Sequence, residues 1–230
     1  MICVVKSKKF WGISLLEVEK LFKNKRFTKV SDRILVHMTV PLFLAGVYCN
    51  ADEIKKMIVH PPGISKQYAG FVVFFSIMSL MMHELGHTMI AISRGVCVSE
   101  IGIGIKEGIF LAYTKMLQLE KLEKKKDKIC ICFGGILMNV FLLSVALIIN
   151  GLWWESIILK IVICVNLLVT LFNFSIYFHS DGADVLKCLL ASKADSNESS
   201  NVKYIVAFSA VLYNLILPVT VIVCFVLRNM

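Results

Sequence analysis

Three ionisable side chains stand within five positions in the segment MMHELGHTMIAI, residues 81–92. His83, Glu84 and His87 fit the pattern H-E-x-x-H, in which two histidines one helical turn apart can present ring nitrogens to one Zn²⁺. Glu84 follows the first histidine, where its carboxylate can accept a proton from a water that the metal activates. The pattern indicates a metal-dependent hydrolase; a structural polar cluster between helices is the alternative.

A zinc hydrolase needs a third protein ligand and an open fourth position. Two candidates lie in the segment HSDGAD, namely His179 and Asp181. Polar side chains recur at helical spacing up to Asp181, which favours this carboxylate over His179. The residues of this stripe are Asn166, Thr170, Asn173, Tyr177 and Asp181. Asp181 could instead cap a following helix, because DGADVLKCLL is typical of a helix start.

A second polar group lies in the segment FGGILMN, residues 133–139. Gly134 and Gly135 allow two helices to approach closely, and ordinary helix packing is the favoured role for both. Asn139, one turn after Gly135, offers a buried amide. For Asn139 and Asn173, the sequence leaves a packing role and a role in the site equally open.

The elements that carry these residues are too apolar for an ordinary soluble domain. The chain has 230 residues, 57% of them hydrophobic, and a mean hydropathy of +0.76. Five stretches of membrane-spanning length contain almost no Asp, Glu, Lys or Arg. They cover residues 34–51, 67–93, 129–154, 157–180 and 204–227. The expected fold is an all-α polytopic membrane protein with about five transmembrane helices.

Lysine and arginine set the expected orientation. Residues 1–33, 94–128 and 180–203 together hold 20 of the 25 Lys and Arg residues. The positive-inside rule then places the N-terminus in the cytoplasm and brings the candidate site residues to the inner half of the membrane. The net charge of +9 is thereby an orientation signal, and nucleic acid is not an expected partner. A bacterial cell membrane is the expected location.

Two segments outside the spans have patterns of their own. Residues 1–33 are predicted to form either a basic amphipathic helix on the inner leaflet or a solvated leader, ahead of a transmembrane domain over residues 34–230. In residues 96–114, apolar residues alternate with small or polar ones, and Gly recurs. This alternation predicts a short β-hairpin after the second span.

Three motifs in this order resemble the site-2 protease class of intramembrane zinc metalloproteases, as a short stand-alone member. They are HELGH, FGGILMN, and Asn173 followed by the pair Asp181-Gly182. The resemblance implies one Zn²⁺ per chain held by His83, His87 and Asp181, with Glu84 as the base. It also implies that Asn139 and Asn173 support the substrate or the transition state.

The expected activity is hydrolysis of a peptide bond in a membrane-embedded or membrane-associated protein or peptide, for regulated proteolysis or peptide maturation. Expected partners are that substrate and the lipid bilayer, and an oligomer or a regulatory membrane partner is left open. One alternative is a membrane protease whose third ligand is a glutamate, either Glu100 or Glu107. Another is a proteolytically inactive membrane protein that binds or transports metal, or binds substrate.

Overall fold

The computed structural model describes residues 8–14, 25–52, 66–106, 109–117, 119, 122, 124–152, 156–175 and 180–190. Several expectations fall outside these ranges, so the structure says nothing about them. They concern the fifth span at residues 204–227, the rival ligand His179, the stripe residue Tyr177 and the rival acid Glu107.

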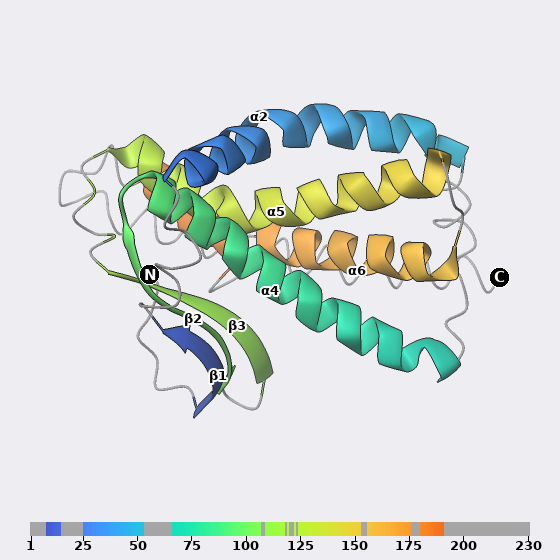
Figure 1. Ribbon diagram of the computed structural model, residues 1–230, viewed down its shortest axis with the longest axis horizontal. Helices are drawn as coiled ribbons and strands as arrows, with labels where there is room; N and C mark the ends of the chain where they lie inside the picture. Colours follow the sequence, from blue (N-terminus) through green and yellow to red (C-terminus); the bar gives the residue numbers. More distant parts are fainter. Residues whose placement is uncertain are drawn as a thin grey trace.

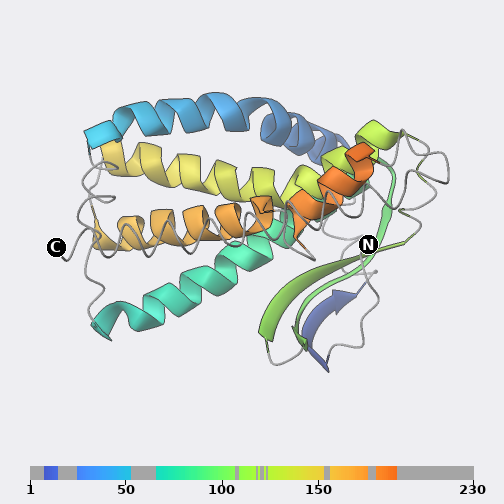
Figure 2. The same ribbon diagram turned by 180° about the vertical axis from the view of Figure 1, so that it is seen from behind.

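Four described helices are long and apolar enough to cross a membrane, which confirms the expected all-α polytopic fold. They are α2 (Lys25–Cys49), α4 (Ala69–Ser93), α5 (Lys125–Leu152) and α6 (Ile157–Phe174). In Figures 1 and 2, α2, α5 and α6 run side by side, and α4 crosses them obliquely.

Helix α5 lies at the centre of this bundle. Of the 18 most apolar consecutive residues of α5, 56% are buried, against 17–22% in the corresponding stretches of α2, α4 and α6. The outer helices leave large apolar side chains exposed, among them Leu44, Phe74, Leu168 and Phe172. Such broad apolar faces match a bilayer rather than water as the surrounding solvent.

Two glycines let α4 and α5 touch through their backbones. A Cβ atom on Gly134 would lie 2.8 Å from the carbonyl oxygen of Gly86, and one on Gly86 would collide with the carbonyl of Gly134. Small residues at a helix crossing permit close packing in a membrane, as the sequence predicted for Gly134. The crossing brings FGGILMN on α5 against HELGH on α4.

Helix α4 ends in a turn that directs the chain into the sheet. Gly95 has a φ of +79°, a left-handed conformation that glycine adopts without steric cost. The amide of Gly95 donates to the carbonyl of Ile92, and the amide of Val96 donates to the carbonyl of Ala91. This pair of bonds is a Schellman motif, which satisfies the carbonyls at the end of a helix. It places the next strand beside the cytosol-facing end predicted for α4.

The predicted hairpin is present, and a third strand joins it. Strands β2 (Cys97–Lys106) and β3 (Ile109–Leu117) pair antiparallel, and β1 (Lys8–Ser14) pairs antiparallel with β2. The amphipathic helix considered for residues 1–33 is therefore wrong for Lys8–Ser14. The edge of β2 offers free backbone groups, and pairing with them satisfies those of β1. In Figure 1 the sheet lies below the C-terminal end of α4.

The fourth span is shorter than expected. Helix α6 ends at Phe174 instead of reaching residue 180, and a separate helix α7 (Asp181–Leu190) follows. Ser175 is extended, and the Ser180 hydroxyl accepts a hydrogen bond from the amide of Ala183, so that Ser180 caps α7. A Cβ atom on Gly182 would lie 2.6 Å from the carbonyl oxygen of Ser175. Glycine thus lets α7 begin against the end of α6.

One arginine ties three helices together at the end that holds the sheet. Arg94 lies 3.0 Å from a carboxylate oxygen of Asp127 at the start of α5, and 3.4 Å from one of Asp32 on α2. Ser93 also donates a hydrogen bond to Asp32. All three charged side chains are mostly buried, which makes these contacts stronger than exposed ion pairs.

Candidate metal centre

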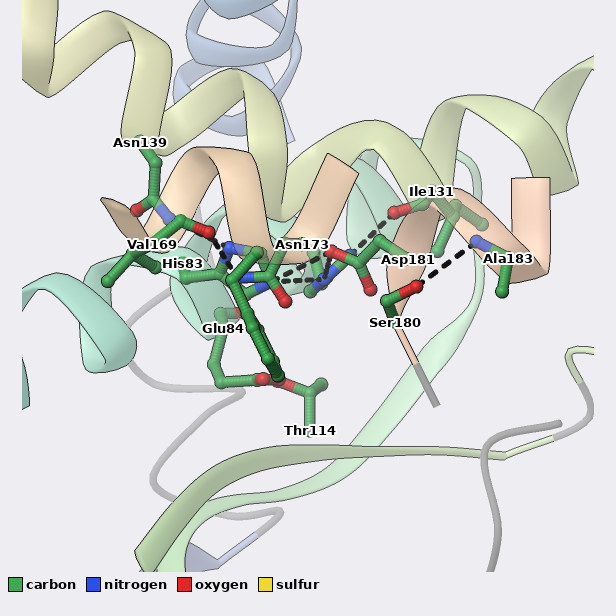
Figure 3. Close-up of polar contacts among 12 residues, drawn as sticks. His83, Glu84, Thr114, Ile131, Asn139, Val169, Asn173, Ser180, Asp181 and Ala183 are labelled. Atoms are coloured by element: carbon green, nitrogen blue, oxygen red, sulfur yellow. Dashed lines mark hydrogen bonds and ion pairs between the residues drawn. The ribbon is translucent and has the colours of Figure 1, made fainter. Parts of the chain in front are cut away.

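Three candidate ligand atoms from two helices converge at one point. The Nε2 atoms of His83 and His87 are 3.2 Å apart. Asp181 Oδ2 lies 2.8 Å from His83 Nε2 and 3.1 Å from His87 Nε2. Both imidazoles are almost fully buried, at 4% and 7% exposure. Figure 3 draws the contact between Asp181, at the start of α7, and His83 as a dashed line.

These distances fit a zinc ion. At Zn–N bonds of about 2.0–2.1 Å, two ligands of a tetrahedron stand roughly 3.3 Å apart. The three observed separations, 2.8, 3.1 and 3.2 Å, are slightly shorter, as expected for atoms that contact one another directly. Two imidazole nitrogens and one carboxylate oxygen are also a donor set that catalytic zinc sites use.

Gly135 leaves the space that such an ion needs. A Cβ atom on this residue would overlap His83 Nε2 and would lie 2.5 Å from His87 Nε2. Any side chain here would therefore occupy the position that both ring nitrogens face. The sequence favoured a packing role for Gly135. The packing contact belongs to Gly134, and Gly135 lines the candidate metal centre.

The local sequence explains how the third ligand arrives. Ser180 caps α7, and Gly182 lets the helix start against α6, so the first residue of α7 points its carboxylate at α4. Burial alone raises the pKa of Asp181, but the charge of His87 and hydrogen bonds from both imidazoles outweigh it and hold this pKa well below its ordinary value. The cap is Ser180, so the alternative of Asp181 as the capping residue is not observed.

The remaining nitrogen of each imidazole also has a partner. His87 Nδ1 lies 2.7 Å from the carbonyl oxygen of Ile131, and His83 Nδ1 lies 3.0 Å from Asn139 Nδ2. Both partners belong to α5, and Asn139 is fully buried. Ring nitrogens of metal-binding histidines commonly have such a second partner, which fixes the orientation of the ring.

Glu84 lies between the histidines and the sheet. One of its carboxylate oxygens lies within 4.8 Å of a ring nitrogen of His83 and of one of His87. The main-chain oxygen of Glu84 accepts hydrogen bonds from Thr88 and from Thr114 on β3, at 2.9 and 3.1 Å. Strand β3 is thereby attached to the same turn of α4 that carries the candidate base, as Figure 3 shows for Thr114.

Two other predicted residues have hydrogen-bond partners other than the histidine pair. The amide of Asn173 donates to the carbonyl of Val169 in its own helix, and no hydrogen bond described in the structure joins it to His83 or His87. Glu100, the rival third ligand, accepts a hydrogen bond from Tyr113 in the sheet. Sequence reasoning missed the roles of Ile131, Thr114 and Ser180, because main-chain contacts and caps depend on positions that no motif specifies.

Comparison with known proteins gives one partial similarity to report. The chain is 24% identical over 144 residues to a Bacillus subtilis (strain 168) protein named "Putative peptide zinc metalloprotease protein YydH". The alignment covers 60% of this chain and 57% of that protein, so the chain matches little more than half of its relative's length. No protein-family profile matches the chain, and no solved structure is detectably similar.

The fold and the site together define a class of protein. It is a polytopic helical membrane protein whose candidate metal centre contains two histidines and an aspartate, with a glutamate nearby. Its similarity to a protein named as a peptide zinc metalloprotease makes zinc the metal suggested for this centre.

Proposed function

We propose that this chain is an intramembrane zinc metalloprotease of the site-2 protease class, acting on a membrane-embedded or membrane-associated protein or peptide. The observation that carries the proposal is the position of Asp181, whose Oδ2 lies within 3.1 Å of both imidazole nitrogens. H-E-x-x-H alone supplies two ligands and a base, and Asp181 supplies the missing third ligand from another helix. The similarity to YydH supports the zinc protease part of the proposal.

Each residue of the candidate metal centre has a separate role in the proposed reaction. His83, His87 and Asp181 would hold the ion, and zinc, when bound, polarises a carbonyl and lowers the pKa of water toward about 7. Glu84 takes a proton from the attacking water and passes it to the nitrogen of the leaving amine. A C–O bond first forms between the water oxygen and the carbonyl carbon, the C–N bond then breaks, and the products are one carboxylic acid and one amine. Asn139 or Asn173 would support the substrate carbonyl, as the family resemblance implies.

Strand β3 offers a way to present the substrate. It is one of the two outer strands of the described sheet, paired with β2 on one side only among the described strands, and Thr114 attaches it to the turn of Glu84. A helical substrate hides its carbonyls in its own hydrogen bonds, so it must become extended before hydrolysis. An extended segment added to β3 would have its peptide bonds exposed near Glu84.

The distribution of Lys and Arg supports a location for this chemistry. With the N-terminus in the cytoplasm of a bacterial cell, His83 and His87 lie in the inner half of α4, and the sheet and α7 lie at the cytoplasmic side. Cleavage would then release the product into the cytoplasm or at the inner membrane surface.

The deciding experiment compares wild type with Glu84→Gln, which keeps the size of the side chain and removes its basicity. We expect both purified proteins to hold about one zinc per chain. Quantitative peptidomics of cells that produce each protein at equal level should show membrane-derived peptides in wild type that Glu84→Gln lacks, since loss of a general base lowers turnover at least 10²-fold.

Glu100→Gln is the matched control, because Glu100 is an acid of the sheet bound to Tyr113 and lies outside the centre. It should leave both the zinc content and the peptide pattern unchanged. Equal zinc with identical peptide patterns in wild type and Glu84→Gln would contradict proteolysis and favour a protein that only binds or transports metal. Loss of zinc in Glu100→Gln would instead favour a glutamate as the third ligand.

A further inference from the structure

The two candidate histidine ligands have different partners at Nδ1. His87 faces the carbonyl oxygen of Ile131 at 2.7 Å. A carbonyl only accepts hydrogen bonds, so His87 carries a proton on Nδ1, and Nε2 is the nitrogen left to bind a metal. Nδ1 of His87 therefore keeps both its proton and its partner whether or not a metal is bound.

His83 is in the opposite situation. Its Nδ1 lies 3.0 Å from Asn139 Nδ2, which is a donor, so Nδ1 accepts and the proton of the neutral ring stands on Nε2. From there it donates to Asp181 Oδ2 at 2.8 Å. In this tautomer the Nε2 of His83 has no lone pair for a metal. Binding a metal through Nε2 requires the proton to move to Nδ1, and Nδ1 then needs an acceptor.

Asn139 contains that acceptor. The residue is completely buried, and its Oδ1 has no hydrogen-bond partner among the described residues. Leaving a buried oxygen unpartnered is destabilising, so its retention calls for an explanation. A half-turn of the amide exchanges the positions of nitrogen and oxygen and presents Oδ1 to His83 Nδ1. Neither a carbonyl nor a carboxylate could serve both tautomers in this way.

We propose that Asn139 is a positioning residue for the metal, which holds His83 in one tautomer without the ion and in the other with it. The amide donates to Nδ1 in the metal-free protein and accepts from Nδ1 when zinc is bound. This inference rests on the proposed zinc site and differs from the role that the family resemblance implies, in which Asn139 contacts the substrate. It assigns Asn139 to zinc affinity instead of turnover.

Two substitutions of nearly equal size separate the roles. Asn139→Asp keeps an acceptor facing Nδ1 and forms the carboxylate–histidine–zinc arrangement, so zinc affinity should stay within about threefold of wild type. Asn139→Leu fills the same volume without a hydrogen bond, and zinc affinity should fall about 10–100-fold. A packing role predicts the reverse order, because buried leucine is tolerated among apolar neighbours and a buried carboxylate is not.

The measurement uses the full chain in detergent micelles and Zn²⁺ in competition with a fluorescent chelator. Wild-type zinc affinity in Asn139→Leu would overturn the inference, whether or not that variant still cleaves peptides. A wild-type protein that binds no zinc would overturn the proposed function instead, so the two failures are distinguishable. Thermal unfolding of the metal-free variants shows whether each is folded.

A second measurement decides the matter even if Asn139→Leu does not fold. In protein with ¹⁵N-labelled histidine, ring nitrogen shifts report which nitrogen carries the proton. His83, assigned by its loss in His83→Gln, should have Nε2 protonated without zinc and Nδ1 protonated with zinc. Metal-free Asn139→Asp should already have Nδ1 protonated, because a carboxylate only accepts. Nδ1 protonation in the metal-free wild type would overturn the inference.

Discussion

Replacing Gly135 by alanine should remove the metal and leave the helix bundle intact. The three atoms nearest to the added Cβ all belong to the imidazoles of His83 and His87, and none to a backbone. The methyl group would lie 2.5 Å from His87 Nε2, whereas an ordinary contact of carbon with nitrogen needs roughly 3.3 Å or more. The ring of His87 must therefore move by about 0.8 Å, and the ring of His83, which lies still nearer to the added Cβ, must move further.

A metal site does not tolerate such a displacement. Zinc–ligand distances in well-formed sites vary by only about 0.2 Å, so a shift several times larger detaches at least one imidazole. Zinc affinity should fall by at least 10²-fold, which corresponds to about 2.7 kcal/mol. The methyl group also fills the space that the ion needs. By contrast, the helix propensity of alanine exceeds that of glycine, so the helix itself should not be weakened.

Zinc content after dialysis against a chelator, together with thermal unfolding of the metal-free protein, measures the two effects separately. Gly70→Ala is the matched control, because nothing lies within 4 Å of a Cβ at Gly70 on α4, and it should retain zinc. Gly134→Ala should lower the unfolding temperature, since its Cβ meets the backbone of α4. Wild-type zinc content in Gly135→Ala would refute the assignment of the metal to the space between the two ring nitrogens.

Two further outcomes follow from features outside the metal centre. Arg94→Gln should lower the free energy of unfolding by about 1–3 kcal/mol, because it removes the positive charge that faces two mostly buried carboxylates. Denaturant unfolding in detergent measures this change, and an unchanged midpoint would contradict it. In a cysteine-depleted background, an impermeant thiol reagent added outside intact cells should label Asp52→Cys but not Glu123→Cys, and labelling of the latter would reverse the proposed orientation.

The sequence predicted the histidine pair and favoured Asp181 as the third ligand, but for a reason that the structure corrects. Asp181 was favoured because it continued a polar stripe along one helix, whereas α6 ends at Phe174 and Asp181 begins α7. The helical period and the apolar composition both persist across the break, so neither reveals it. The observable signals were local: Ser180 suits a helix cap, and Gly182 permits close approach.

Contacts between distant segments account for the other differences between the sequence-based predictions and the structure. Strand β1 forms because β2, about 90 residues later, offers it an edge, and a short basic segment gives no sign of that pairing. The distinction between Gly134 and Gly135 likewise depends on how α5 is rotated against α4. The sequence predicted that a close approach would occur there, but not which glycine would face the imidazoles.

The separation of the ligands along the chain has a consequence for biosynthesis. Asp181 lies 94 residues after His87, so a ribosome working at 5–20 residues per second needs roughly 5–20 s to reach it. During that interval the nascent protein has the two histidines and Glu84, but α5 and α7 are incomplete. A full set of three ligands exists only after α6 has been synthesised and α7 can dock. On the proposed function, zinc would therefore be captured late in assembly, and a partly inserted chain would have no peptidase activity toward its neighbours in the membrane.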